Sequence, residues 1–150
     1  MIKRLAHDIK IGTLVGFHLQ MVSLRLNEVA RIMLADYAIS PAKVTALSLI
    51  DANPGCEQSA LGRELSINRA SAMKLVNWLA ERGLVERRPG RDLRSNALHL
   101  TETGEIQLRE MIDRLRLSEE GVLRTLGAQE QTELLRLLKQ LHREKPQRQG

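Results

Sequence analysis

The chain has 150 residues, of which 43% are hydrophobic and 27% are charged, and its formal net charge is +5. This balance is typical of a single globular domain and excludes disordered and fibrous proteins. No apolar run reaches the roughly 20 residues that a membrane span needs. Residues 1–8 contain no apolar stretch of the secretory type, and the single cysteine, Cys56, has no disulfide partner in the chain. We therefore expect a cytoplasmic protein without a membrane segment.

Positive charge is concentrated in the middle of the chain. Between Ala60 and Leu100 there are eight Lys and Arg residues against four Asp and Glu residues. The chain has only one Phe, one Tyr and one Trp, too few to build the aromatic platform on which single-strand binders stack bases. Among nucleic acids, the composition favours a duplex as the partner.

The first segment, about residues 8–34, predicts a long helix because apolar residues recur at helical spacing and no proline interrupts it. Ser40 is a suitable N-cap and Pro41 a suitable first residue for a second helix. Asn53-Pro54-Gly55 then predicts a turn.

A compact unit follows. Residues 57–65 predict a short helix, and Asn68 is a suitable N-cap for another helix that reaches about Arg82. Gly83 stands where a left-handed residue closes a helix. Residues 84–87 and 97–100 read as two short strands on either side of a turn that is rich in arginine. This order predicts a helix-turn-helix followed by a β-hairpin.

Thr101 is a suitable cap for a last helical region, which Gly127 is expected to break in two. Leucines of this region (Leu134, Leu135, Leu138 and Leu141) and the first helix present more apolar surface than one small protomer can cover. Pairing of two copies about a two-fold axis would bury that surface. The alternative is a monomer whose terminal helices pack only on each other.

The residues that open the helix after Asn68 suit the major groove of DNA. Arg can pair with guanine, Ser can bond several base edges, and Ala or Met can pack on a thymine methyl group. Arginines of the hairpin suit the minor groove, and Asp92 can brace the hairpin tip. The candidate DNA-contacting residues are Asn68, Arg69, Ala70, Ser71, Met73, Lys74, Arg88, Arg91, Asp92, Arg94 and Ser95. The alternatives are an ordinary charged surface and a winged helix that docks on a protein.

Residues 61–87 and 92–104 resemble the multiple antibiotic resistance regulator (MarR) family, through Gly-Leu-Val-x-Arg at 83–87, Asp-x-Arg at 92–94 and Leu-Thr-x-x-Gly at 100–104. The resemblance implies a mainly α fold with a small β-hairpin wing, in which one domain covers residues 1–150. A winged helix-turn-helix at about 41–101 would be flanked by dimerisation helices at about 8–34 and 105–144. It also implies an obligate homodimer on a pseudo-palindromic operator, and a regulator that a small molecule releases from DNA. Residues 69–74 would then read the major groove, and Asp92 and Arg94 the minor groove.

Two residues depart from the family pattern. Ala70 stands where Ser or Thr is common, so one contact to DNA is expected to be missing. Trp78 stands where a basic or polar residue is usual. Its indole can pack under the wing, which we favour, or against a sugar of the DNA.

The resemblance further implies an effector pocket between the dimerisation helices and the DNA-binding unit. Phe17, His18, Met21 and Arg25 in the first helix are the candidate lining residues, and His18 and Arg25 could hold the carboxylate of an aromatic or phenolic acid, or the phosphates of its coenzyme A thioester. The alternative is a face that forms salt bridges or is simply exposed.

Cys56 could sense oxidants, but no basic residue adjoins it to lower the pKa of its thiol, so a small buried side chain is the simpler interpretation. The histidines are dispersed, and no phosphate-binding loop, nucleophile motif or metal-ligand spacing is present. We expect no catalytic residues, metal or cofactor.

Overall fold

The computed structural model describes residues 10–90 and 96–143, which form six α-helices and three short strands. The helices are α1 (Val15–Met33), α2 (Pro41–Ala52), α3 (Gln58–Glu64), α4 (Arg69–Glu81), α5 (Glu102–Leu123) and α6 (Ala128–Arg143). The strands are β1 (Cys56–Glu57), β2 (Val85–Pro89) and β3 (Asn96–Leu100), and 3-10 turns cover Lys10–Thr13 and Ala35–Tyr37. The predicted fold class, mainly α with a small β wing, is confirmed. None of the helices in these residues is long and apolar enough to span a bilayer.

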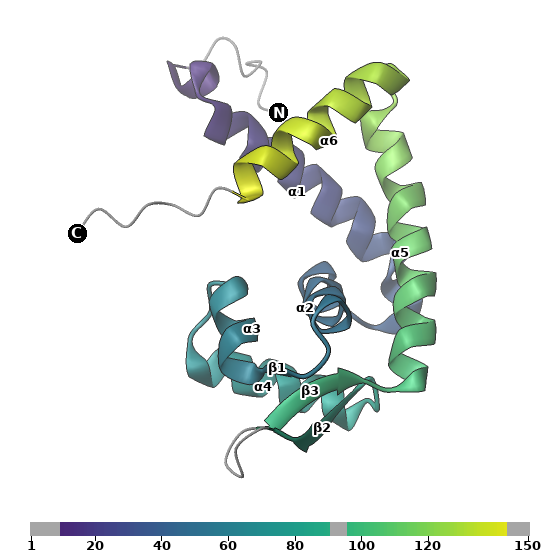
Figure 1. The fold of residues 1–150 in the computed structure, drawn as a ribbon. Coiled ribbons are helices and arrows are strands. Elements are labelled where there is room, and N and C mark those ends of the chain that lie inside the picture. The colour runs from purple at the N-terminus through teal and green to yellow at the C-terminus, as the bar shows by residue number, and fades with distance from the viewer. Residues whose placement is uncertain (1–9, 91–95, 144–150) are drawn as a thin grey trace, which may run out of the picture.

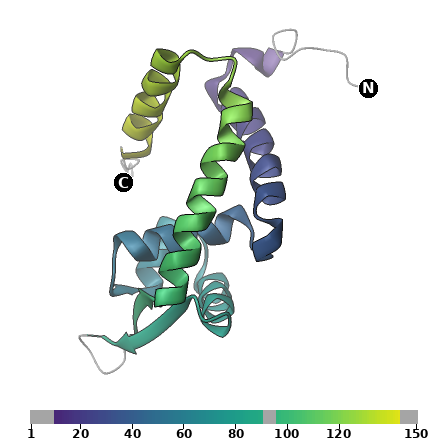
Figure 2. The same ribbon diagram turned by 90° about the vertical axis from the view of Figure 1, so that its right-hand side faces the viewer.

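The elements form two groups (Figure 1). Helices α2, α3 and α4 and the small sheet make a compact unit at the lower end of the molecule. Helix α5 rises from the sheet, packs along α1, and leads at its far end into α6. In Figure 2, α1 and α6 lie on opposite sides of α5. The long terminal helices therefore extend away from the compact unit.

The core of the compact unit explains the helical pattern of α4. Ala72, Val76 and Leu79 of α4 are buried on the side of the helix that packs against α3 and β2, whereas the other side is exposed. The remaining core is supplied mainly by aliphatic residues of α2, β2, β3 and α5, including Leu47, Ile50, Val85, Leu98 and Met111.

The sheet is antiparallel with strand order β1-β3-β2. Val85 lies opposite Leu100 and Pro89 opposite Asn96 in the hairpin, while Cys56 pairs with Leu98 on the other edge of β3. The sequence interpretation had no strand at 56–57, because two residues carry no alternation and their partner lies about forty residues further along the chain. The first helix is also shorter than predicted, since a separate 3-10 turn precedes Val15.

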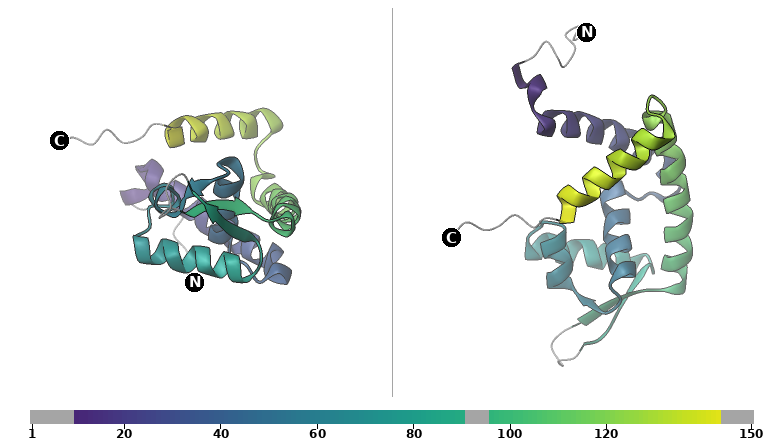
Figure 3. Two further views of the ribbon diagram at one scale, coloured as in Figure 1. Left: turned by 60° about the horizontal axis from the view of Figure 1, so that its bottom comes forward. Right: turned by 45° about the horizontal axis from the view of Figure 1, so that its top comes forward.

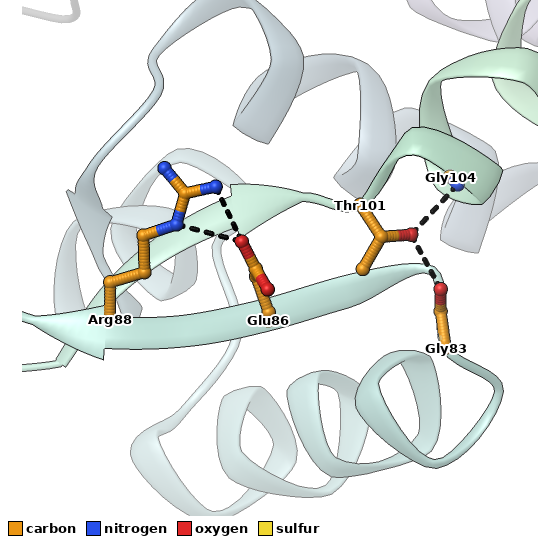
Figure 4. Close-up of polar contacts among 5 residues, drawn as sticks. All are labelled: Gly83, Glu86, Arg88, Thr101 and Gly104. Atoms are coloured by element: carbon orange, nitrogen blue, oxygen red, sulfur yellow. Dashed lines mark hydrogen bonds and ion pairs between the residues drawn. The ribbon is translucent and has the colours of Figure 1, made fainter.

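A dense junction joins the compact unit to α5 (Figure 4). The Thr101 hydroxyl donates to the carbonyl of Gly83 at 2.5 Å and accepts from the backbone N–H of Gly104 at 2.9 Å, so it caps α5 and ties it to the end of α4. Gly83 has φ +68, as the predicted left-handed closure of α4 requires. A Cβ at Gly104 would lie 2.1 Å from the carbonyl oxygen of Leu84. Only glycine allows this approach.

The corner between α5 and α6 is held by hydrogen bonds within one chain. The Gln131 amide donates to the carbonyls of Leu123 and Leu126 at 3.2 and 3.0 Å, and Gly127 N–H donates to the Glu130 carboxylate at 2.7 Å. The predicted break near Gly127 is confirmed.

Helix α6 shows no extended packing against any other described element, and apolar side chains of α1 and α6 face outward. The most exposed are Val15, Leu24 and Ile32 of α1, Leu14 just before it, and Leu135 and Leu141 of α6, between 53% and 69% exposed. Within one chain α1 packs along α5, whereas α6 shows no comparable contact with α1.

Substituting Gly104→Ala should destabilise the protein by about 1–3 kcal/mol, because the new methyl group meets backbone that cannot move without breaking the junction. Chemical denaturation would measure the loss. Gly121→Ala on the same helix is the matched control. Its Cβ would meet no atom within 4 Å, so this helical site should gain about 0.5–1 kcal/mol. Equal stability of the Gly104→Ala variant and the parent would contradict the tight junction.

Candidate nucleic-acid interface

Helices α3 and α4 are joined by a tight turn that brings them into close contact. Ser66 adopts a left-handed conformation with φ +54, and Ile67 N–H donates to the carbonyl of Gly62 at 3.0 Å. A Cβ at Gly62 would lie 3.2 Å from the Ala72 methyl carbon, so the small residue lets the helices approach. The pair is a helix-turn-helix, as predicted.

The start of α4 is fixed by its cap. The Asn68 side-chain oxygen accepts from Ser71 N–H at 2.8 Å, which confirms Asn68 as the N-cap. The side chains that follow in the first two turns are exposed: Arg69, Ala70, Ser71, Met73 and Lys74. No acidic residue lies in the first turn of the helix. This end of α4 therefore presents two cations, a hydroxyl and a half-exposed methionine. In Figure 3 (left), α4 runs in teal along the lower edge of the molecule.

Beside this face lies a recess of about 540 Å³ that brings Arg63 and Arg69 to one site. Its polar rim is completed by Glu57 of β1, by Gln58 and Ser59 at the start of α3, and by Asn96 at the start of β3. None of these except Arg69 was predicted as a site residue. Their proximity depends on the tight turn and on the pairing of β1 with β3, which bring together segments that lie apart in sequence.

The hairpin carries arginines that differ in their surroundings. Arg88 is exposed but forms an ion pair with the Glu86 carboxylate, with Nε at 2.7 Å and Nη2 at 2.5 Å (Figure 4). Arg87 donates to the Asn77 side-chain oxygen at 2.5 Å and so links β2 to α4. The other predicted wing residues, Arg91, Asp92, Arg94 and Ser95, lie outside the described residues.

Trp78 is half-buried and packs against the core of the compact unit. Two cations lie over its ring: Lys43 Nζ of α2 is 4.4 Å from the ring centroid, and the Arg82 guanidinium carbon is 4.2 Å from it.

A polar network connects the compact unit to α5. The Tyr37 hydroxyl donates to the Glu110 carboxylate at 2.7 Å, and this hydrogen bond, with burial, raises the pKa of Tyr37 above its usual value. Arg82 donates to the Tyr37 carbonyl at 3.1 Å, and Arg114 donates to the Asp36 carboxylate at 2.8 Å. The network joins the end of α4, the 3-10 turn after α1, and the middle of α5.

The four candidate effector residues lie on α1. Phe17 is half-buried, and its ring packs edge-on against His18 with centroids 5.4 Å apart. His18, Met21 and Arg25 are exposed, and His18 Nε2 already lies 2.6 Å from the carbonyl of Gly12. Only the other ring nitrogen of His18 remains for a ligand.

Cys56 lies in β1 and is half-buried beside a mostly apolar cavity of about 360 Å³. Burial raises the pKa of the Cys56 thiol above its usual value, so the reactive thiolate is disfavoured. This environment supports the interpretation of Cys56 as a packing residue and weakens the oxidant-sensing alternative.

Two substitutions of the cap residue Asn68 distinguish its contribution to stability from the effect of charge on DNA binding. Asn68→Ala should cost about 1 kcal/mol of stability because Ser71 N–H loses its acceptor. Asn68→Asp keeps an acceptor there and should fold as stably as the parent, yet bind duplex DNA more weakly because it adds a negative charge to the interface. Thermal denaturation and duplex titration measure the two effects. Unchanged DNA affinity of Asn68→Asp would place the interface elsewhere.

Comparison with known proteins agrees with this geometry. A family model described as MarR family matches residues 39–95. A protein of Thauera aromatica, "Putative transcriptional regulatory protein for hcr operon", is 32% identical over 142 residues, which covers 93% of this chain and 85% of that protein.

Solved structures share this fold over most of the chain. The structure "Transcriptional repressor, CouR, bound to a 23-mer DNA duplex" is 30% identical with a TM-score of 0.79, and the match covers 90% of this chain and 99% of that one. A MarR-family protein of Mycobacterium tuberculosis in complex with salicylic acid has the same fold, with 23% identity, a TM-score of 0.73, and 86% and 96% of the two chains covered. The chain therefore belongs to the MarR family of DNA-binding transcriptional regulators, and it is not an enzyme.

Proposed function

We propose that this regulator is a cytoplasmic homodimer that represses transcription by occupying a pseudo-palindromic operator, and that a small aromatic acid or its coenzyme A thioester releases it. The observation that carries the proposal is the capped start of α4, where Arg69, Ser71 and Lys74 are exposed and no acidic residue lies in the first turn. A winged helix that docks on a protein would be expected to show an apolar or acidic face here. Repression itself is supported by the DNA-bound repressor that is 30% identical to this chain.

In this proposal residues 69–74 read base edges in the major groove. Arg69 and Lys74 supply donors, Ser71 supplies a hydroxyl, and the half-exposed Met73 suits a thymine methyl group. Asn68 positions these residues by capping the helix, and Ala70 brings the backbone close to DNA without a polar contact of its own.

The hairpin would enter the adjacent minor groove. Arg88 begins the approach from β2, and Arg91, Asp92, Arg94 and Ser95 belong to the proposed tip on the basis of the sequence alone. Because Glu86 pairs with Arg88 in the protein, we expect Arg88 to contribute less to DNA affinity than Arg94 does.

A homodimer is supported by the apolar faces that α1 and α6 leave open. In this proposal the whole chain acts as one unit, in which residues 8–34 and 105–144 pair with a second copy and residues 41–101 bind one half-site. Leu134, Leu137, Leu138 and Leu141 recur at helical spacing along one side of α6. Two-fold pairing would place the two α4 helices about one DNA turn apart.

The effector site is proposed between α1 and the compact unit. Arg25 and the free nitrogen of His18 can receive a carboxylate, while Phe17 and Met21 supply an apolar wall. These side chains are largely exposed in one protomer, so the partner would complete the enclosure. The salicylate complex of the Mycobacterium tuberculosis protein supports an aromatic acid as the class of ligand.

Arg69→Ala should relax base preference. The parent protein would first be used to select preferred duplexes from a random pool. The ratio of the affinities for selected and scrambled duplexes should then be about tenfold smaller for the variant than for the parent, because a bidentate contact to guanine is worth about 1–3 kcal/mol. Arg116→Ala, an exposed change on α5, is the control and should keep the preference. Failure of the parent to select any sequence would remove the operator proposal.

Leu138→Glu should convert the dimer to a monomer and weaken operator binding, because the new charge enters the apolar side of α6. Sedimentation measures the mass. Gln140→Glu adds the same charge on another side of α6 and should leave the dimer intact. A monomeric parent protein would contradict the dimer directly.

Salicylate, benzoate and benzoyl-coenzyme A can each be tested by thermal shift. We expect at least one to raise the melting temperature of the parent, and the shift should shrink in Arg25→Gln. The same compound should weaken duplex binding. A shift that Arg25→Gln leaves intact would move the effector site away from α1.

A further inference from the structure

Trp78, the only tryptophan of the chain, brings together two cations from different helices. Lys43 lies in the first turn of α2, and Arg82 follows the last residue of α4. Lys43 Nζ and the Arg82 guanidinium carbon lie 4.4 and 4.2 Å from the centroid of the indole ring. We call Lys43, Trp78 and Arg82 the cation–indole cluster.

Among the described residues, the partners of these two cations are uncharged groups, namely the indole ring and, for Arg82, the Tyr37 carbonyl. In the part of the chain that the structure describes, no ion pair involves Lys43 or Arg82, whereas Arg88 and Arg114 each pair with a carboxylate. Arg82 gives one of its donors to the Tyr37 carbonyl, which is uncharged, and Arg82 is exposed. Attraction to an aromatic ring holds a cation in place without cancelling its charge. The cluster therefore keeps two positive charges, both held in position.

The cluster continues the proposed DNA-reading face. Lys74, Trp78 and Arg82 follow at intervals of four residues, so they form one stripe along α4 that starts within the base-reading turns. Lys43 extends this stripe onto α2. The other side of the α4 face is bordered by Asn77 and its hydrogen bond to Arg87 of the hairpin.

We propose that Lys43 and Arg82, held over Trp78, bind phosphates of the duplex backbone beside the bases that α4 reads. This inference rests on the proposed function, because it assumes that α4 enters the major groove. Two fixed cations on the border of a base-reading helix suit the regularly spaced phosphates of a duplex, and contacts of this kind set register and affinity without reading sequence.

The salt dependence of duplex binding tests the proposal, with a mixed-sequence 30-base-pair duplex as the probe. Lys43→Gln should reduce the slope of log affinity against log salt by about 0.9 for each phosphate lost, hence by about 2 in a dimer. Between 50 and 200 mM salt the parent should then lose about tenfold more affinity than the variant loses. Lys139→Gln, an exposed change on α6, is the control and should keep the parent slope.

Fluorescence gives a second readout at the site itself, since all tryptophan emission comes from Trp78. We expect the duplex to change this emission in the parent and to change it much less in Lys43→Gln. Trp78→Leu is unsuitable for the test, because loss of a half-buried ring is expected to destabilise the protein.

The outcomes separate this inference from the proposed function. Suppose that base preference depends on Arg69, but Lys43→Gln keeps the parent's salt slope and the parent's duplex-induced change in Trp78 emission. This result would overturn the phosphate-binding role of the cluster and leave the proposed function standing. If polyglutamate changes the Trp78 emission and the duplex does not, the cluster binds an acidic protein rather than DNA phosphates, and the inference is overturned. No binding of any duplex by the parent would overturn both.

Discussion

The contact between Gly104 and the carbonyl of Leu84 sets the relation between the DNA-binding unit and the rest of the chain. Here α5 begins, and its first turn lies against the backbone that leaves α4. The Thr101 hydroxyl serves both sides, because it donates to Gly83 and accepts from Gly104. The end of the recognition helix and the start of the long α5 helix are therefore fixed to each other over a few residues. A rotation of one would displace the other.

The Tyr37 network makes a second connection between the same parts. It links Arg82 at the end of α4 to Glu110 on α5, and Arg114 joins α5 to the turn after α1. The two connections lie at different positions along α5, one in its first turn and one near its middle, so the compact unit is held at two points rather than hinged at one. In the proposed regulator, an effector bound near α1 would act on α4 through these contacts.

Much of this fold follows from local patterns. The caps at Asn68 and Thr101 and the left-handed Gly83 each depend on neighbours a few residues away, and all were predicted correctly. The pairing of β1 with β3, the position of Lys43 over Trp78, and the Tyr37 network depend on residues 35 to 78 positions apart. Periodicity carries no signal for such contacts, so these features, and the recess that joins Arg63 to Arg69, emerge only from the structure. The ion pair that occupies Arg88 was missed for a related reason, because a count of arginines does not show which are already paired.

The hydrogen bonds of Gln131 bear on how two chains would meet. Since they close the α5–α6 corner from within one protomer, the angle of α6 is set before any partner arrives. Association would then resemble the docking of preformed surfaces more than the mutual folding of loose helices, and less conformational entropy would be lost in the encounter. The same rigidity restricts the choice of partner. A related chain with a different corner angle would offer its leucines in the wrong direction, so the geometry of this turn would favour pairing of like with like.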